Sequence, residues 1–270
     1  MVDYQVAIPS YRRADVLKKN TLATLERFGV RDDQIHIFVA DEEELMDYRQ
    51  AVGERYNLVV GALGKVEQQK FYNAYFQSGT PLLNMDDDIA DVLELNDEGK
   101  LSPSGERMQK IVDVGFGLCE KYGAKMWGLN PVSNGFFMRN QATVGLRFLI
   151  GNFFGNYAGD LAISGSDREM RCDSGDDWLT TVRSFLENGR IVRIEWLNAK
   201  TRMFAKGGIE AQLSERGIER KLDHHEKLTS LAALFPDLLT VTTKAGGVTN
   251  LRLRTLTEAK IPRGLATTMG

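Results

Sequence analysis

A short apolar run that ends in three aspartates constrains this chain more than any other stretch. Residues 81–85 (Pro-Leu-Leu-Asn-Met) predict a buried strand, and Asp86-Asp87-Asp88 follow it directly. Three adjacent carboxylates repel one another, and a divalent cation would relieve this repulsion, because Mg²⁺ and Mn²⁺ prefer carboxylate oxygens and commonly bridge to phosphate. Taken alone, the triplet fits equally well an acidic turn in which Asp87 or Asp88 caps a following helix.

Strands and helices alternate on the way to this triplet. Apolar patterns predict strands at 4–8, 35–40 and 58–60, and helices at 14–28, 45–56 and 66–76. Such alternation predicts an α/β fold with a mostly parallel sheet, whose ligands bind where the strands end. The sequence contains neither Gly-x-Gly-x-x-Gly after the first strand nor a Gly-Lys-Ser/Thr loop. A dinucleotide site and a P-loop are therefore disfavoured, and a nucleotide bridged by a metal remains.

The second half has a looser pattern. Helices are expected at 107–122, 179–188 and 228–235, strands at 125–131 and 191–196, and short antiparallel strands with binding loops within 132–167. Asp176-Asp177 open the second of these helices, and His224-His225 precede the third. We expect residues 1–200 to form one catalytic domain, with a donor half at about 1–100 and an acceptor half at about 101–200. Residues 201–270 would be an extension packed on it.

Composition and charge narrow the class of protein. The chain has 270 residues, 43% of them hydrophobic, and no apolar run long enough to cross a bilayer. Charged residues within the first 20 positions disfavour a signal peptide, and two cysteines disfavour a disulfide framework, so a cytoplasmic protein is expected. Residues 190–270 carry 14 basic and 8 acidic residues, whereas residues 1–189 carry 20 and 29. A basic C-terminal part suits a polyanionic partner, or simply a solvated helical face.

Four motifs in order resemble those of GT-A glycosyltransferases. They are the loop Ile8-Pro9-Ser10-Tyr11-Arg12-Arg13, Asp41 after the second strand, Asp86-Asp87-Asp88 after the fourth, and Gly175-Asp176-Asp177-Trp178 at a later helix. The resemblance covers residues 4 to about 197. With Trp127-Gly128-Leu129-Asn130-Pro131 and the compact length, the chain looks most like phage TET-associated glycosyltransferases, which modify 5-hydroxymethylpyrimidines in DNA.

This resemblance implies a nucleotide-sugar donor, most often a UDP-sugar, and Mn²⁺ or Mg²⁺. The implied donor-binding residues are Pro9, Ser10, Tyr11, Arg13, Asp41, Lys65, Gln69, Asp86 and Asp87. Tyr11 would stack on the base, and Lys65 would meet the diphosphate. Asp41 would contact base or ribose, although it could equally be the N-cap of the next helix. Asp88 and Asp86 would hold the metal, with His224 or His225 as a further ligand.

The resemblance also implies roles on the acceptor side. Asp177 would be the general base, a role that suits a partly desolvated carboxylate. Asp176 would be an acceptor contact or a structural contact. Both could instead stabilise a helix N-terminus. Trp127, Asn130, Asn134 and Trp178 would contact the acceptor, and Arg202, Lys206, Arg252 and Arg254 would contact a nucleic-acid backbone. In a phage, the enzyme would work in the host cytoplasm.

Two rival functions remain open from sequence. One is a glycosyltransferase that builds a surface polysaccharide or glycolipid, against which the lack of a membrane-binding segment argues mildly. The other, of a different class, is a non-catalytic nucleic-acid-binding protein on a degenerate transferase fold. The sugar, the modified base, the anomeric outcome and the oligomeric state stay open as well.

Overall fold

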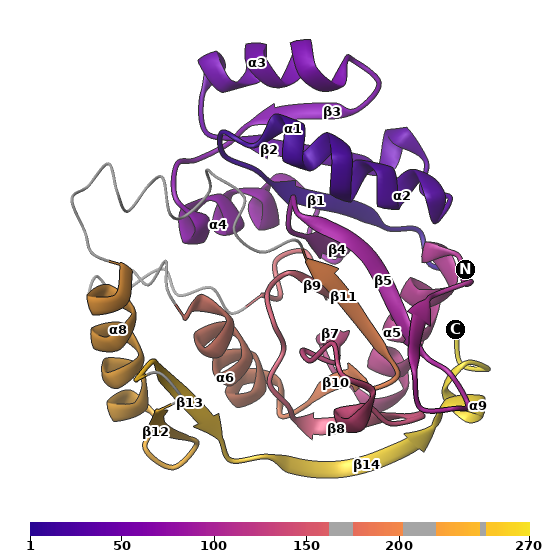
Figure 1. Cartoon of the computed structure of the whole chain (residues 1–270), viewed down its shortest axis with the longest axis vertical. Helices are drawn as coiled ribbons and strands as arrows, with labels where there is room; N and C mark the ends of the chain where they lie inside the picture. The colour runs from indigo at the N-terminus through magenta and orange to yellow at the C-terminus, as the bar shows by residue number, and fades with distance from the viewer. Residues whose placement is uncertain (162–174, 202–219, 244–246) are drawn as a thin grey trace.

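A large mixed sheet organises the computed structural model, which describes residues 1–161, 175–201, 220–243 and 247–270 (Figure 1). Within these ranges the sheet has nine strands in the order β14-β8-β10-β7-β9-β4-β1-β2-β3. Their bounds are β1 Gln5–Pro9, β2 Ile35–Val39, β3 Asn57–Val60, β4 Pro81–Met85, β7 Met126–Leu129, β8 Gln141–Leu146, β9 Phe153–Tyr157, β10 Ile191–Ile194 and β14 Leu256–Pro262.

The strand pairing confirms a mostly parallel sheet. Strands β3, β2, β1 and β4 pair in parallel, and β7 pairs in parallel with β10. Strand β9 is antiparallel to both β4 and β7, and β8 is antiparallel to both β10 and β14. Among the described strands of this sheet, only β9 and β8 therefore run against the others. The carboxyl ends of β1, β2, β4 and β7 consequently share one edge.

Helices cover both faces of this sheet (Figure 1). Their bounds are α1 Ala14–Leu17, α2 Ala23–Arg27, α3 Glu42–Val52, α4 Lys65–Tyr75, α5 Met108–Tyr122, α6 Asp176–Asn188, α8 Arg220–Leu234 and α9 Arg263–Ala266, with short 3₁₀ turns at Asp32–Gln34 and Gly135–Phe137. The helix expected at 14–28 forms as one stretch in which a π-helical turn, Lys18–Leu22, separates α1 from α2. Such a turn shifts the side chains that face the sheet, and it often marks a functional position.

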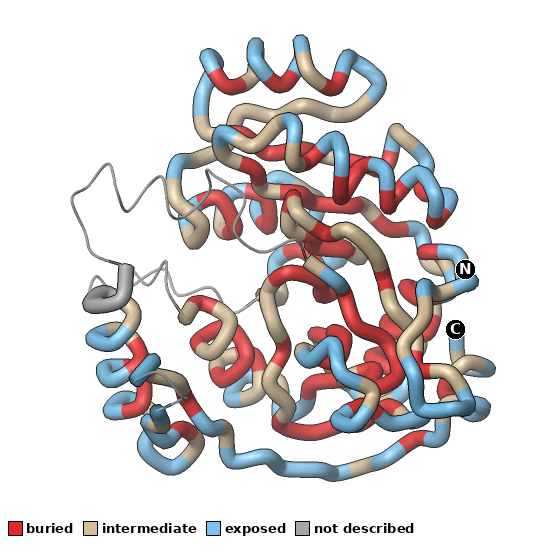
Figure 2. Tube along the Cα trace, viewed as in Figure 1, coloured by how far each residue is buried: buried red, intermediate tan, exposed pale blue. Residues whose placement is uncertain are grey.

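Two small antiparallel sheets complete the described fold. One contains β5 Ile89–Leu95, β6 Leu101–Pro103 and β11 Leu197–Thr201, and the other contains β12 Leu239–Thr243 and β13 Thr249–Leu253. Helix α8 and the β12–β13 pair pack on α6 through an apolar cluster that includes Leu179, Leu228 and Leu251. Figure 2 shows burial concentrated on the central strands and on the helix faces turned toward them.

The sequence interpretation placed His224 and His225 before a helix, and this was wrong. Both lie inside α8, because that helix begins at Arg220 rather than near Leu228. Their ring nitrogens contact β13, with His224 Nε2 3.2 Å from the Thr249 carbonyl and His225 Nδ1 2.7 Å from the Thr249 hydroxyl. Both histidines thus help to attach α8 to the β12–β13 pair.

Candidate active site

The backbone around the aspartate triplet is fixed by the π-helical turn. The Thr21 hydroxyl donates to the Asp86 carbonyl at 2.7 Å and accepts from the Ile89 amide at 3.0 Å. On the other side, the Asp86 amide donates to the Asn152 carbonyl at 2.9 Å. Because Thr21 is fully buried, these bonds are protected from water. The triplet is therefore a bend between β4 and β5 that is held from both sides, and no helix follows it, which removes the N-cap interpretation.

Asp87 points into the protein and anchors the first loop. Ser10 Oγ donates to Asp87 Oδ2 at 2.6 Å, and Arg13 Nη1 donates to Asp87 Oδ1 at 2.8 Å. The Tyr48 hydroxyl lies 2.6 Å from Ser10 Oγ and accepts from the Arg13 amide at 3.0 Å. Burial raises the pKa of Asp87 to about 6, although Arg13 opposes the shift. Asp87 therefore positions the loop that the sequence assigned to the donor.

Asp86 and Asp88 are the carboxylates left to face a ligand. Burial raises the pKa of Asp86 to about 7, with Asp88 and Asp87 adding to the shift and Lys65 opposing it. Burial also raises the pKa of Asp88, which lies 3.6 Å from Arg13 Nη2. Carboxylates with raised pKa values lack sufficient positive charge around them, and a hard divalent cation fits such an oxygen donor set.

A complete protein cage for a metal is not formed by the side chains that the structure describes. Among them, no three His, Cys, Asp or Glu residues are grouped closely enough to hold a metal ion. In particular, the ring nitrogens of His224 and His225 contact Thr249. Figure 1 shows that α6 lies between their helix, α8, and the end of β4. A cation at Asp86 and Asp88 would need the remaining ligands from a substrate or from water.

Lys65 joins the triplet to the second acidic pair. Its ammonium lies 3.0 Å from Asp176 Oδ2 and 3.7 Å from Asp177 Oδ1. Burial alone would lower the pKa of Lys65, but Asp176, Asp177 and Asp86 surround it and raise the pKa well above its usual value. Gly151 fits here because a Cβ at that position would collide with Asp177 Oδ1. One lysine thus connects the start of α4, the start of α6 and the end of β4.

The two acids of this pair differ in environment. The Asp176 side chain is 9% exposed and pairs with Lys65, and burial raises its pKa to about 7. The Asp177 side chain is 23% exposed, and its buried Oδ1 has no hydrogen-bond partner among the described residues. Asp177 is therefore the more accessible of the two carboxylates, while Asp176 is the anchor for the lysine.

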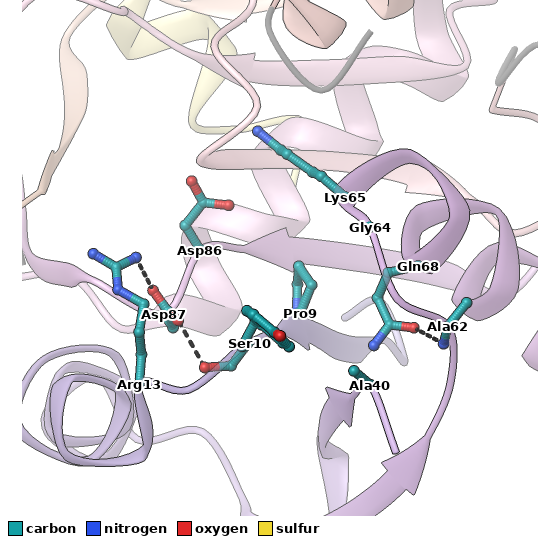
Figure 3. Close-up of a pocket in the computed structure, with 11 residues that line it drawn as sticks. Pro9, Ser10, Arg13, Ala40, Ala62, Gly64, Lys65, Gln68, Asp86 and Asp87 are labelled. Atoms are coloured by element: carbon teal, nitrogen blue, oxygen red, sulfur yellow. Dashed lines mark hydrogen bonds and ion pairs between the residues drawn. The ribbon is translucent and has the colours of Figure 1, made fainter. Parts of the chain in front are cut away.

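A pocket of about 100 Å³ lies beside this cluster (Figure 3). It is lined by Pro9, Ser10, Tyr11, Arg13, Ala40, Ala62, Gly64, Lys65, Gln68, Asp86 and Asp87. Asp86 and Lys65 extend toward the same side of it (Figure 3). The Arg12 guanidinium lies 5.0 Å from the centre of the Tyr11 ring, a cation–π contact. Gln69 lines an adjoining smaller hollow together with Lys65 and Asp86.

The loops around this pocket depend on residues that the sequence interpretation did not select. The buried Glu44 carboxylate accepts from the Arg12 amide at 2.6 Å and from the Ala40 amide at 3.0 Å. Arg12 has a positive φ of 52°, an uncommon conformation for a residue with a side chain. Glu44 therefore ties together two loops that line the pocket. Its place three residues after Asp41 resembles a capping box, a signal that could have identified it.

Asp41 has the helix-capping role that the sequence left open as an alternative to donor binding. It is the N-cap of α3, and its Oδ1 accepts from the Glu44 amide at 2.9 Å. Asp41 is exposed and does not line the pocket beside the triplet. Gln68, a second residue to which the sequence assigned no role, accepts from the Ala62 amide at 2.6 Å and donates to the Val39 carbonyl at 3.1 Å. This side chain shapes the far wall of the pocket.

The residues expected at the acceptor are not all exposed. Trp127 is fully buried in the main core, where its ring fills the space left by Gly115 and Gly155, so it is a core residue and does not line a surface. Asn130 is also buried, and its amide donates to Glu195 Oε2 at 2.9 Å. Both lie in or just after β7 as expected, but their side chains are turned inward.

Two other acceptor residues remain partly accessible. Asn134 is exposed and caps a 3₁₀ turn by accepting from the Phe136 amide at 3.0 Å. Trp178 is half-buried and stacks on Phe148, with ring centroids 4.0 Å apart. Trp178 directly follows Asp177 in α6, so its stack lies next to the second acidic pair.

The basic residues expected at a nucleic acid divide into two groups. Arg252 and Arg254 are exposed, at and just after the end of β13. Arg202 and Lys206 lie outside the described residues. No described helix is both long and apolar enough to span a bilayer.

Solved structures share this fold. No family model and no curated protein matches the sequence. A glucosyl-3-phosphoglycerate synthase from Mycobacterium tuberculosis, solved with Mn²⁺, UDP and glucosyl-3-phosphoglycerate, matches with a TM-score of 0.50 and 11% identity, covering 97% of this chain and 91% of that one. The same synthase with phosphoglyceric acid gives a TM-score of 0.51 and 10% identity over 97% and 90%. A mycobacterial protein gives 0.51 and 12% over 97% and 87%.

These identities are low, so the likeness establishes the fold and not the activity. The strand order, the helices on both faces and the acidic bend after β4 agree with it. The fold class expected from sequence is confirmed: this chain has the GT-A glycosyltransferase fold.

Proposed function

We propose that this protein is a metal-dependent glycosyltransferase that uses a UDP-sugar. The observation that carries the proposal is the Lys65 contact with Asp176 and Asp177, since it gathers two acidic motifs beside one pocket. Holding these carboxylates close together has an electrostatic cost. A non-catalytic protein with a degenerate transferase fold would gain nothing that offsets this cost. The structural neighbours solved with UDP and Mn²⁺ or Mg²⁺ support the choice of donor and metal.

The donor would lie along the shared edge of the sheet. Tyr11, held by Arg12 on one face, would stack on the base, and Pro9 and Arg13 would frame it. Lys65 would contact the diphosphate from the start of α4, where backbone amides also favour anions. Asp86 and Asp88 would hold Mn²⁺ or Mg²⁺, which when bound offsets the charge of the departing diphosphate.

The acceptor hydroxyl would be activated by Asp177. In a single displacement, the hydroxyl oxygen bonds to the anomeric carbon while the bond from that carbon to the diphosphate oxygen breaks. The electron pair of the broken bond goes to UDP, and the hydroxyl proton goes to the Asp177 carboxylate. Asp177 suits this role because it is partly exposed and its Oδ1 lacks a hydrogen bond among the described residues. Asp176 would keep Lys65 in place.

A panel of nucleotide sugars tests this function. The protein with Mn²⁺ should release UDP from at least one UDP-sugar, and EDTA should stop the release. Metal-dependent thermal stabilisation by UDP should accompany it. The rival of a non-catalytic module on a transferase fold would be supported instead by a folded protein that shows neither effect with any donor.

We propose DNA bearing 5-hydroxymethylpyrimidines, as in phage genomes, as the acceptor class to examine first. The exposed Arg252 and Arg254 support this proposal, because two cationic side chains close together in and just after β13 can contact phosphates. Mass spectrometry of hydroxymethylated DNA, digested after incubation with several donors, should show an added sugar, and the yield should fall with added salt. Transfer only to a free sugar or a lipid would favour the polysaccharide or glycolipid alternative.

A further inference from the structure

Two half-buried arginines lie on the α6 side of the sheet with too little negative charge between them. Arg193, in β10, contacts Glu195 Oε1 from both Nε and Nη2 at 2.9 Å, and it donates from Nη1 to the Phe148 carbonyl at 3.2 Å. Arg147 follows β8 and donates from Nη2 to the Thr257 hydroxyl. The Nε of Arg147 is buried and has no hydrogen-bond partner among the described residues. A guanidinium fork with an unpaired buried donor is an incomplete site.

Glu195 cannot complete the site for both arginines. Its Oε1 already accepts from Arg193 and from the Thr143 hydroxyl at 2.8 Å, and its Oε2 accepts from Asn130 at 2.9 Å. Burial lowers the pKa of Arg147 and the neighbouring Arg193 lowers it further, whereas Glu195 opposes this shift only in part. The described surroundings thus hold two guanidinium groups for one carboxylate. An anion with several oxygens, such as a phosphate group, would match both the charge and the fork geometry.

This pair is connected to the proposed general base through a short path. Phe148, next to Arg147, stacks on Trp178, and Trp178 follows Asp177 in α6. The same segment reaches Gly151, which closely approaches Asp177 Oδ1. One loop, residues 147–151, therefore has the arginine at its start and the proposed base beside its end. The Phe148–Trp178 stack joins the residue after Arg147 to the residue after Asp177.

We propose that Arg147 and Arg193 bind a phosphate group of the acceptor, so that the acceptor hydroxyl is directed to Asp177. The acceptor role rests on the proposed glycosyl transfer, whereas phosphate binding by the two arginines does not. The phosphate is either a monoester on a small acceptor or a diester in DNA, which share the same recognising chemistry.

The binding step is tested with inorganic phosphate and without metal. Phosphate is titrated by calorimetry into the EDTA-treated protein at constant ionic strength, so that no cation is available to Asp86 and Asp88. Arg147→Met should weaken binding by about tenfold or more, and Arg147→Lys by less, because lysine keeps the charge but loses the fork. The control Arg31→Met, at an exposed arginine paired with Asp33, should bind as the wild type does. Equal binding by wild type and Arg147→Met, with unchanged melting temperatures, overturns the proposal.

The transfer step then separates the two sources of phosphate. The assay contains Mn²⁺ and an active UDP-sugar. It compares three acceptors: a phosphorylated hydroxy acid, the same acid without its phosphate, and DNA bearing 5-hydroxymethylcytosine. Wild type should prefer the phosphorylated acid to its dephosphorylated form, or should glycosylate the DNA. Arg147→Met should lose that transfer, while its rate of UDP-sugar hydrolysis without an acceptor is unchanged. A preference that survives Arg147→Met overturns the acceptor role. If wild type releases UDP from no donor, the proposed function fails, and the phosphate titration still decides the arginine site.

Discussion

The ammonium of Lys65 lies 3.0 Å from Asp176 Oδ2, and this pair joins the first turn of α4 to the first turn of α6. The two helices belong to the donor half and the acceptor half that the sequence predicts. Because Asp86 and Asp177 also act on Lys65, the lysine links the donor-side carboxylate Asp86 to the acceptor-side pair Asp176 and Asp177. Turnover should therefore depend on this lysine.

Replacing Lys65 with Met should remove the positive charge shared by the acidic cluster. We expect sugar transfer to fall by about 10²-fold, a loss typical for removal of one preorganised electrostatic group. The measurement is the rate of UDP release at saturating Mn²⁺. Lys70→Met is the matched control, since Lys70 lies on the same helix and pairs with Glu67 instead. Wild-type turnover by a folded Lys65→Met protein would contradict the link.

Asp177→Asn should separate chemistry from donor binding. Asparagine keeps the shape of the side chain but cannot accept the acceptor proton, so kcat should fall by about 10²-fold to 10⁴-fold. UDP affinity in Mn²⁺ should stay close to that of the wild type. Asp176→Asn should instead weaken UDP binding, because Asp176 holds Lys65. If both variants lowered kcat alone, or both lowered UDP affinity alone, the division of roles between the two acids would be wrong. The anomeric configuration of the product, read by NMR, would show whether a single displacement occurs.

Glu44→Gln should weaken binding of the UDP-sugar without changing the chemical step. The Glu44 carboxylate accepts two backbone amides, whereas a glutamine offers one oxygen, so either Arg12 or Ala40 loses its partner. We expect KM for the UDP-sugar to rise by about fivefold to 100-fold with kcat little changed, since an unmade hydrogen bond costs about 1–3 kcal/mol. Glu43→Gln, at the exposed neighbour in the same turn, should have no effect. A change in kcat with an unchanged KM would argue against a positioning role at the donor.

The metal-free protein should lose stability as pH rises. The folded pKa values of Asp86 and Asp176 are about 7 and that of Asp87 is about 6, against 3.8 for an ordinary aspartate. Groups with raised pKa values favour the folded state fully below their unfolded pKa, and this contribution is lost as pH rises through the folded pKa. It should therefore decline between about pH 4 and pH 7.

Melting temperatures at pH 5 and pH 7.5, in EDTA and in Mn²⁺, check this expectation. The decrease toward pH 7.5 should be larger in the wild type than in Asp86→Asn, and Mn²⁺ should reverse it at pH 7.5 in the wild type only. The acidic cluster would not be under electrostatic strain if both proteins showed the same decrease in EDTA.

Local pattern was enough to predict the sheet and its acidic bend. Apolar runs stopped by Pro, Gly or acids located β1 to β4, and their order placed Asp86 to Asp88 after the fourth strand. Side-chain direction was harder to predict. Trp127 and Asn130 lie in β7 and at its end, where helices cover both faces, so an aromatic or amide there is buried whatever its chemistry suggests.

Other features depend on contacts between distant residues. The bonds of Thr21 to the bend and of Glu44 to two loops join segments far apart in sequence, and no periodicity reports them. The start of α8 was misplaced because Arg220 to Lys227 have no clear apolar stripe and the helix is stabilised by packing of Leu228 and Leu231. The contact between Lys65 and Asp176 likewise follows from the fold and not from either motif alone.

The most direct test of the central claim is UDP binding by wild type and by Asp88→Asn, measured by calorimetry with Mn²⁺ and with EDTA. Asp97→Asn, in the exposed turn after β5, is the control. We expect wild type and Asp97→Asn to bind UDP only with Mn²⁺, and Asp88→Asn to keep its melting temperature but lose the metal-dependent binding. UDP binding by wild type that is equal in Mn²⁺ and EDTA, or that survives in Asp88→Asn, would contradict the assignment of this bend as the metal and diphosphate site.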